Sequence, residues 1–371
     1  MASIDATRCF ALDYVGARAK FRATASETGC ALSSYRHPTA TGPDDQPLTI
    51  DVARLGDAQA SNQLVIVSGT HGLEGTSGSA AQIGWLQSAG ARALPHGVSV
   101  LFVHALNPHG FAHGTRTTEN NVDLNRNFID HDTPHPHNSG YTQLYPYLLP
   151  DNWAPEALAT YADAVAAFRD RNGADALFDA QARGQYDFPQ GTNYGGLQRE
   201  WSNLALETIV ADHLGAAQRV GFIDWHTGIG DWGQSFFLCF NDEGGRLQAE
   251  AARWWGGDRI LGQRPHGLAR PNYQGLVFHG LTDFLGGRPM IGAVIEFGTR
   301  GAHMRRALQL DMWLKFKAEH DSERVRLLRA DLHDAFVPVS MHWREDTTQQ
   351  AISITQQAVE GLASCSLANA A

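Results

Sequence analysis

The sequence predicts an α/β fold, because buried strands alternate along the chain with helices. Four apolar runs are bounded by turn residues and predict strands covered on both faces, at 64–67, 98–108, 220–230 and 291–299. A fifth run, 48–56, begins with Leu48, Ile50 and Val52 at alternate positions, which predicts a strand with one solvated face. Apolar residues at helical spacing follow the first buried strand, so we expect a helix over 76–90.

One large domain spanning residues 1–371 is expected from the length of the chain. Between 129 and 200 the pattern loosens into polar loops around one stretch, 155–171, whose apolar residues recur at helical spacing. We interpret 129–200 as an insertion over the functional face of the domain rather than as a separate domain. Two surface helices are predicted towards the C-terminus, at 322–336 and 349–362.

The overall composition argues against several classes of protein. Hydrophobic residues make up 43% of the chain and charged residues 18%, so we expect a substantial core and no gross disorder. The formal net charge of −10 argues against a nucleic-acid partner, because nucleic-acid binders normally present a basic surface. The cysteines form no C-x-x-C pair, which argues against a zinc finger or a disulfide framework.

The N-terminal segment and the distribution of apolar residues bear on location. Residues 1–21 carry charges and lack the long apolar stretch of a secretory signal. No run approaches the ~18 consecutive apolar residues that a membrane span needs. We therefore expect a soluble cytoplasmic protein without a membrane partner. An oligomer is compatible with the sequence, but no feature supports one.

His71 and Glu74 lie in a glycine-rich turn, HGLEG, directly after the predicted strand 64–67. The carboxyl ends of the strands in an open α/β sheet form the edge where ligands bind. An H-x-x-E pair in a turn can converge on one point, and an imidazole with a carboxylate supplies two of the three protein ligands of a catalytic zinc. The alternative is a polar loop in which the glutamate caps the following helix.

His226 is the candidate for a third metal ligand, because it ends another apolar strand just before a turn, in DWHTG. Asp224 lies two residues earlier, so it points to the same face of a regular strand and could orient a ligand by a hydrogen bond. The alternative for His226 is a core histidine that is hydrogen-bonded to a backbone carbonyl.

Glu296 is a carboxylate within the apolar run IGAVIEFGT. An unpaired buried carboxylate is costly, so this residue needs a partner or a function. As a general base it would take the proton from an attacking water and pass it to a leaving nitrogen. The alternative is a structural salt bridge.

Arg116, Asn125 and Arg126 stand out among the turn residues of 107–128, which follow the predicted strand 98–108. Arginine makes forked contacts to carboxylates, and it also stabilises the oxyanion that develops on a carbonyl under attack. Apolar residues flank the last two in VDLNRNF, which favours a rigid position over the alternative of a surface loop.

Six motifs occur in one order between residues 64 and 299, namely HGLEG, NPHGF, GTR, VDLNRNF, DWHTG and VIEFGT. In this order they resemble the zinc carboxypeptidases in the broad sense, and most closely the branch that contains aspartoacylase and succinylglutamate desuccinylase. The resemblance implies a mixed β-sheet sandwiched between α-helices and one Zn²⁺ per chain. His71, Glu74 and His226 match the zinc ligands of the family. Glu296 matches its catalytic glutamate, and Arg116 matches the arginine that polarises the scissile carbonyl.

The resemblance also assigns residues to the substrate. Asn125 and Arg126 match the pair that grips the free carboxylate of the substrate. Tyr194, in GTNYGG, is our candidate for the tyrosine that closes over the substrate. The 129–200 insertion lengthens the gap between Glu74 and His226, so the loops that set specificity need not match those of either named enzyme.

Together these features predict a zinc-dependent hydrolase that cleaves an amide or peptide bond next to a free carboxylate, in a peptide or another small molecule. One alternative is an N-acyl amino acid deacylase of the aspartoacylase type. Another is a non-catalytic relative that binds a metal or ligand, which the joint presence of three ligands, Arg116 and Glu296 disfavours. A serine hydrolase is suggested by GTSGS around Ser77, but this stretch fails the G-x-S-x-G pattern at its last position.

Overall fold

The computed structural model describes residues 5–319 and 322–365. Its strands are β1 (Ala31–Thr41), β2 (Pro47–Leu55), β3 (Asn62–Ser68), β4 (Val98–His104), β5 (Arg219–Trp232), β6 (Ser235–Leu238) and β7 (Met290–Gly298). Its α-helices are α1 (Ala6–Cys9), α2 (Tyr14–Glu27), α3 (Gly75–Leu86), α4 (Ala89–Arg92), α5 (Pro108–His113), α6 (Ser139–Leu144), α7 (Pro155–Asn172), α8 (Ala174–Ala182), α9 (Trp201–His213), α10 (Arg246–Trp255), α11 (Gly257–Ile260), α12 (Val277–Phe284), α13 (Met304–Phe316), α14 (Glu323–Phe336) and α15 (Met341–Ser364).

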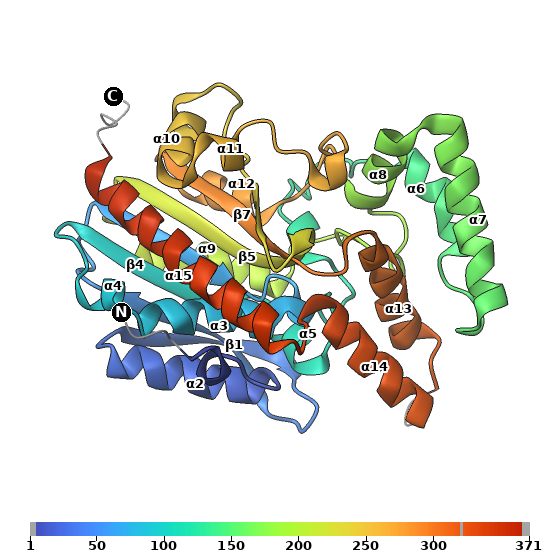
Figure 1. Cartoon of the computed structure of the whole chain (residues 1–371), viewed down its shortest axis with the longest axis horizontal. Coiled ribbons are helices and arrows are strands. Elements are labelled where there is room, and N and C mark those ends of the chain that lie inside the picture. Colours follow the sequence, from blue (N-terminus) through green and yellow to red (C-terminus); the bar gives the residue numbers. More distant parts are fainter. Residues whose placement is uncertain (1–4, 320–321, 366–371) are drawn as a thin grey trace.

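The strands form one mixed sheet in the order β1-β2-β4-β3-β5-β7-β6 (Figure 1). The four central strands, β4, β3, β5 and β7, run parallel, whereas β1, β2 and β6 pair antiparallel with their neighbours. The predicted α/β class with a mixed sheet between helices is therefore confirmed. Parallel strands bring their carboxyl ends to the same edge of the sheet, and this edge positions the candidate site.

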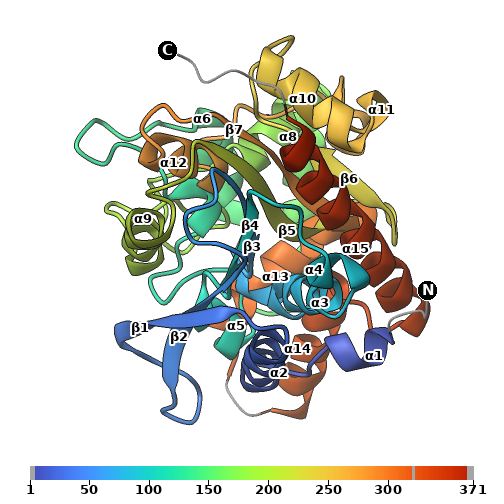
Figure 2. The same ribbon diagram turned by 90° about the vertical axis from the view of Figure 1, so that its left-hand side faces the viewer.

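Alternation along the central strands divides their side chains between two cores. In β3, Leu64 and Ile66 belong to one core, and Val65 and Val67 belong to the other. The first face of the sheet is covered by α2, α3, α10 and α15, and the second by α9 and α12 (Figure 2). A sheet buried on both faces needs apolar residues at every position, which explains why its central strands read as continuous apolar runs.

The predicted elements are present with shifted ends. The strand predicted to have one solvated face, 48–56, is β2, and it is instead buried at every residue after Pro47. The predicted strand 98–108 stops at His104, because Asn107 caps α5 and Pro108 begins that helix. The helix expected over 76–90 ends at Leu86, and α15 begins at Met341, before the predicted 349. The edge strands β1 and β6 were not predicted, since β1 has only one buried residue and no apolar run.

The segment 129–200 contains α6, α7 and α8, which lie together at one side of the molecule (Figure 1). These helices share a small apolar cluster formed by Leu144, Phe168, Leu177 and Ala180.

Among residues 5–319 and 322–365, none of the helices combines enough length with enough apolar character to span a bilayer.

Asp51 lies fully buried on β2 and pairs with two arginines of α2. Arg18 Nε lies 2.6 Å from Oδ2 of Asp51, and Arg22 Nη1 lies 2.6 Å from Oδ1. Burial favours a raised pKa for Asp51, but hydrogen bonds from Arg18 and Ser34 outweigh burial and hold the pKa below its usual 3.8. Because the folded-state pKa is depressed, this stabilisation is present above about pH 4 and is lost as the pH falls through the folded-state pKa.

We expect Asp51→Asn to lower the free energy of unfolding by ~1–2 kcal/mol at neutral pH, because it removes the buried partner of Arg18 and Arg22, whose side chains are 31% and 38% exposed and remain partly solvated. The difference from wild type should shrink as the pH falls below about 4, because Asp51 is then protonated in the unfolded chain, and it should vanish at the still lower pH where folded Asp51 is protonated. Urea denaturation at neutral and acidic pH measures both effects. A difference that is the same at both pH values would contradict this role for Asp51.

Candidate metal centre and active site

The turn after β3 contains a short 3-10 helix, η1 (Gly72–Glu74), which His71 precedes and in which Glu74 is the last residue. Glycine at position 72 lets α5 pack directly against this turn, because a Cβ atom there would lie 2.0 Å from the carbonyl carbon of Gly110. The backbone N–H of Gly72 also donates to the carbonyl of Arg116 at 3.1 Å. Close packing thus fixes the turn, and the three-residue spacing brings both side chains to the same side of it.

His226 reaches the same point from β5. The parallel pairing of β3 and β5 places Asp224 opposite Val67, so His226 lies beside the turn that follows β3. His226 does not end its strand as predicted, because β5 continues to Trp232. The register of β5 and β7 pairs His226 with Glu296. Because directly paired residues point to the same face of a sheet, Glu296 lies next to His226 on the face that carries the site.

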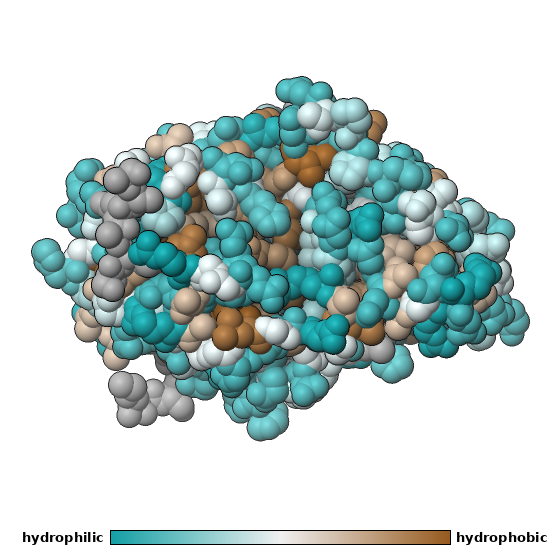
Figure 3. All heavy atoms as spheres, turned by 90° about the horizontal axis from the view of Figure 1, so that it is seen from above, coloured by the Kyte–Doolittle hydropathy of each residue, from teal (hydrophilic) through white to brown (hydrophobic). Residues whose placement is uncertain are grey.

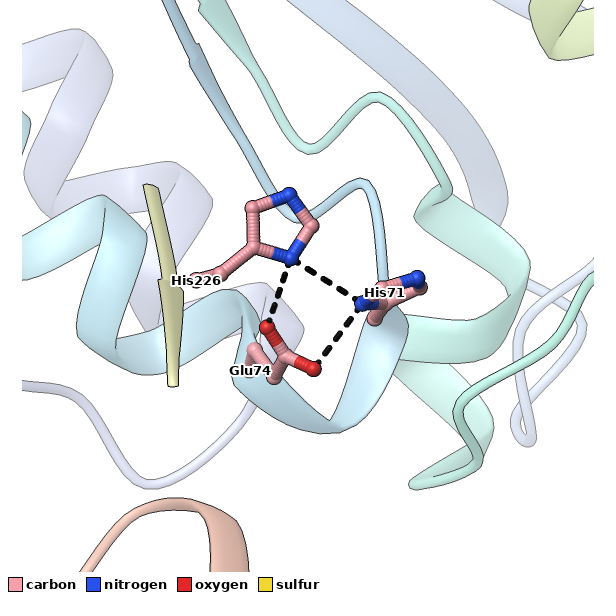
Figure 4. A group of neighbouring side chains, drawn as sticks. All are labelled: His71, Glu74 and His226. Carbon is pink, nitrogen blue, oxygen red and sulfur yellow. Dashed lines mark hydrogen bonds and ion pairs between the residues drawn. The ribbon is translucent and has the colours of Figure 1, made fainter. Parts of the chain in front are cut away.

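His71, Glu74 and His226 bring their ligand atoms together in a buried triangle (Figure 4). His71 Nδ1 lies 2.9 Å from Glu74 Oε1, His226 Nδ1 lies 3.1 Å from Glu74 Oε2, and the two Nδ1 atoms are 3.1 Å apart. A tetrahedral zinc with bonds of ~2.0–2.1 Å separates neighbouring ligand atoms by roughly 3.3 Å. Both the donor set and its spacing therefore fit a zinc ion.

A buried aspartate binds the outer ring nitrogen of each histidine. Asp123 Oδ1 lies 3.0 Å from His71 Nε2, and Asp224 Oδ2 lies 2.8 Å from His226 Nε2. Thr70 donates to both carboxylate oxygens of Asp224, at 2.9 and 3.1 Å. Carboxylates in this position orient metal-binding histidines and increase their basicity. His226 is therefore not bound to a backbone carbonyl, which was the alternative for a core histidine.

The carboxylates attract positive charge to the centre of the triangle. Burial disfavours a charged His226, but Asp224 and Glu74 outweigh burial and raise its pKa well above the usual value. Burial likewise disfavours a charged Glu74, but His71 and His226 outweigh burial and lower its pKa. A proton or a metal cation supplies the charge that these groups favour.

Glu296 is 8% exposed and faces the cavity beside His226. Its carboxylate accepts one hydrogen bond, from Ile229 N at 3.3 Å, and has no ion-pair partner among the described residues. The alternative of a structural salt bridge therefore does not apply. Burial raises the pKa of Glu296 to about 7, with Glu74 acting in the same direction and His226 opposing it. A carboxyl group with this pKa can both accept and donate a proton near neutral pH.

Arg116 lines the cavity and is anchored to the metal-binding residues. Its Nη1 donates to Glu74 Oε1 at 3.0 Å, and its Nε and Nη2 donate to Asp123 Oδ2 at 3.3 and 3.2 Å. Its backbone N–H donates to Asp311 Oδ2 at 3.0 Å. Since a guanidinium has five N–H donors, one N–H on each terminal nitrogen is left for a ligand in the cavity.

Asn125 and Arg126 lie on the short 3-10 helix η2 (Leu124–Arg126) and are 6% and 5% exposed. Asn125 Oδ1 accepts from Val277 N at 2.8 Å, so its NH₂ group is left for the cavity. Arg126 Nε and Nη2 donate to the carbonyl of Ala182 at 3.1 and 2.6 Å, and Nη1 donates to the carbonyl of Asn125 at 2.5 Å. Two N–H groups of Arg126 are left without a protein partner among these bonds and are available to a ligand. The guanidinium is buried and fixed by three hydrogen bonds, so the alternative of a mobile surface loop does not apply.

One cavity brings together most of the predicted site residues, namely His71, Glu74, Arg116, Asn125, Arg126, His226 and Glu296. Its wall also contains the apolar side chains of Leu238, Phe240, Leu276 and Val294, and four residues of the 129–200 segment, Phe178, Gln181, Ala182 and Asn193. The side of the molecule that carries α8, α10 and α11 is mostly hydrophilic, with apolar residues visible in a central hollow (Figure 3).

The structure does not bring Tyr194 into this cavity. Tyr194 is only 5% exposed, but its side chain does not line the cavity. Its backbone carbonyl accepts a hydrogen bond from Asp123 N at 2.7 Å. Tyr273 lines the cavity instead, with the guanidinium of Arg126 5.1 Å from its ring centre. Burial raises the pKa of Tyr273 to about 12, so its hydroxyl is a neutral donor. Tyr273 was missed because RPNYQGL has no periodic pattern; its proline and glycine are the only signal of an ordered turn.

Asp123 was also missed, although the motif VDLNRNF contains it. Its contacts with His71 and Arg116 predict a role in metal binding. Asp123→Asn keeps the size of the side chain but weakens the contacts to His71 and Arg116. We expect metal affinity to fall by ~10–100-fold, the usual cost of losing a partner that orients a ligand. Competition with a zinc chelator measures the affinity. Asp51→Asn is the matched control, since Asp51 is equally buried and arginine-paired but lies outside the cavity. Equal metal affinity in both variants would contradict the role of Asp123.

Several solved structures are similar to this chain. Thrombin activatable fibrinolysis inhibitor matches with a TM-score of 0.49 and 10% identity, over 95% of this chain and 74% of that chain. A metallo-carboxypeptidase from Burkholderia cenocepacia matches with a TM-score of 0.43 and 14% identity, over 92% and 68%. Succinylglutamate desuccinylase from Chromobacterium violaceum matches with a TM-score of 0.35 and 14% identity, over 86% and 74%.

With identities of 10–14% and TM-scores below 0.5, these matches do not indicate the activity of this chain. No curated protein matches the sequence. The family model described as "Protein of unknown function (DUF2817)" matches residues 10–350. The chain therefore belongs to this family.

Proposed function

We propose that this protein is a zinc-dependent hydrolase that cleaves an amide or peptide bond next to a free carboxylate. The observation that carries the proposal is the triangle of His71, Glu74 and His226, whose ligand atoms lie within 4.8 Å of one another beside Glu296. A bound zinc ion supplies a Lewis acid that polarises a carbonyl and makes a water molecule more acidic. The imidazoles and the carboxylate are the ligand types that a catalytic zinc takes.

Glu296 acts as the general base in this proposal. Its carboxylate accepts a proton from the attacking water and returns that proton to the nitrogen of the leaving group. The pKa of about 7 suits both transfers, because a group is most effective in both directions when its pKa lies near the working pH. Two adjacent strands hold Glu296 and His226 side by side, so the base needs no rearrangement to act.

Arg116 stabilises the negative charge that develops on the carbonyl oxygen under attack. It has an N–H left on each terminal nitrogen, and its other donors are tied to Glu74 and Asp123. A donor that is already in place costs no reorganisation during the reaction, which is what makes such groups effective.

Arg126 and Asn125 bind the free carboxylate of the substrate. Arg126 offers two N–H groups and Asn125 offers its NH₂ group, and both side chains are almost fully buried. A buried guanidinium that meets a carboxylate forms strong charge-assisted hydrogen bonds. A substrate without this carboxylate would leave the cation buried and uncompensated. The same arrangement serves a C-terminal peptide bond or the amide of an N-acyl amino acid, so both substrate types belong to the proposal.

A pair of substrates tests the proposal. A screen of N-acyl amino acids and small peptides with the zinc-loaded protein identifies one substrate, and its carboxylate is then replaced by a carboxamide. We expect kcat/KM to fall by ~10²-fold or more for the amide, because the buried charge of Arg126 loses its partner. Arg126→Met should reduce this preference by lowering activity on the acid far more than on the amide.

Arg116→Met is the matched comparison, because its proposed contact is with the carbonyl oxygen that both substrates share. It should lower activity on the acid and on the amide to a similar extent. If the wild-type protein hydrolyses the acid and the amide equally well, Arg126 is not the carboxylate anchor and the proposed substrate class is wrong.

A further inference from the structure

Arg305 and His266 line the same cavity, but none of the roles above uses them. Arg305 lies on the first turn of α13, and its guanidinium lies 5.8 Å from the centre of the Phe178 ring. His266 contacts the same ring edge-on, with ring centres 5.7 Å apart. Phe178, from the 129–200 segment, therefore brings together a cation, Arg305, and an imidazole, His266, whose pKa is lowered by burial and by Arg305.

The guanidinium of Arg305 has no anionic partner. Within the described residues it makes no hydrogen bond and no ion pair, whereas Arg116 pairs with two carboxylates and Arg126 donates to two carbonyls. Burial lowers the pKa of Arg305, and the nearby Tyr161 opposes this change only in part. A half-buried cation without counter-charge is costly, so an anion that enters the cavity is favoured at this point.

The backbone of His266 supports a functional role for this side of the cavity. Its φ angle is 54°, in the left-handed region that a residue other than glycine rarely adopts. Such strain persists only where the surrounding structure requires it, and it is concentrated at binding and active sites. In this conformation the imidazole of His266 contacts the same Phe178 ring as the guanidinium of Arg305.

The two groups are more exposed than the carboxylate anchor, so they lie nearer the mouth of the cavity. His266 is exposed and Arg305 is half-buried, whereas Asn125 and Arg126 are 6% and 5% exposed. A substrate whose carboxylate reaches the buried anchor therefore has its other end, on the acyl side of the bond to be cleaved, nearest the mouth.

We propose that Arg305 and His266 form a second anion-binding subsite, which selects substrates with an acidic group on the acyl side of the scissile bond. The proposal rests on the proposed function, because that function supplies the orientation of the substrate. The preferred substrate would then be a dianion. One carboxylate binds Arg126 and Asn125, and the other binds the guanidinium of Arg305, with His266 donating a hydrogen bond.

The test compares N-acetyl-glutamyl-leucine with N-acetyl-glutaminyl-leucine, which differ only in the charge of the side chain on the acyl side. Binding is measured by calorimetry on the zinc-loaded Glu296→Gln variant, so that it does not depend on turnover. We expect the glutamyl peptide to bind at least ~10-fold more tightly, the scale of one charge-assisted hydrogen bond. Arg305→Met should abolish the preference, and Arg305→Lys, which keeps the charge, should retain part of it.

Arg306→Met is the matched control, because Arg306 is the next residue but is exposed, lies over Trp153 and does not line the cavity. It should leave the preference unchanged. Equal binding of the two peptides, or a preference that survives Arg305→Met, would overturn the second subsite while leaving the proposed function intact. Binding of neither peptide would contradict both proposals.

Discussion

Glu296→Gln is expected to keep the fold and the bound zinc but to lower kcat by at least ~10²–10⁴-fold, the usual contribution of a general acid–base group. Glutamine is nearly isosteric with glutamate and can still accept the hydrogen bond that Ile229 N donates at 3.3 Å. Its amide oxygen cannot take a proton from water, so the chemical step loses its base. Steady-state kinetics and the zinc content of the same sample measure the two properties together.

Glu200→Gln is a matched control for this experiment. Glu200 is 4% exposed and burial raises its pKa, as it does for Glu296, but it contacts Asn120 and does not line the cavity. Its replacement should leave kcat close to the wild-type value. If Glu296→Gln also keeps near-normal kcat with zinc bound, Glu296 has a structural role and the water must be activated by another group.

His226→Ala is expected to weaken zinc binding by more than the ~10–100-fold that the loss of a hydrogen-bonding partner costs, because it removes a ligand itself. Zinc that binds only the folded protein raises its unfolding temperature, so the shift on adding zinc reports binding without any substrate. We expect a clear shift for the wild-type protein and a much smaller one for His226→Ala.

His213→Ala provides the comparison for this variant. His213 lies at the end of α9, contacts Ser33 and Tyr35, and does not line the cavity. The variant should keep the zinc-dependent shift even if its unfolding temperature without zinc is lower. A full zinc-dependent shift in His226→Ala would show that the metal is held by other residues.

The metal-binding residues could be predicted from the sequence because each is tied to a strand. His226 belongs to β5, and the turn of His71 and Glu74 directly follows β3. Because β3 and β5 pair in parallel, His226 lies beside the turn that follows β3 although it is far from that turn in the chain, and β5 itself continues to Trp232. Glu296 could be predicted for a related reason, since a carboxylate in an apolar strand is conspicuous.

The rest of the cavity could not be predicted, because its residues lie on loops and helices whose positions depend on tertiary packing. Tyr273 lies in an irregular loop, and Phe178 belongs to the segment that shows only a weak pattern. Tyr194 was the candidate for the family tyrosine that closes over the substrate, but its backbone carbonyl binds Asp123 N and its side chain lies outside the cavity. Arg305 looks like any arginine on the polar side of a helix until its contact with Phe178 of α8 is known.

The central claim is that His71, Glu74 and His226 together hold one zinc ion, and anomalous diffraction tests it most directly. Data collected on either side of the zinc absorption edge from a crystal of the zinc-loaded protein locate the ion without reference to activity. The account predicts one strong peak per chain, ~2.0–2.2 Å from His71 Nδ1, His226 Nδ1 and an oxygen of Glu74. No peak at this position, or a peak coordinated by other residues, would contradict it.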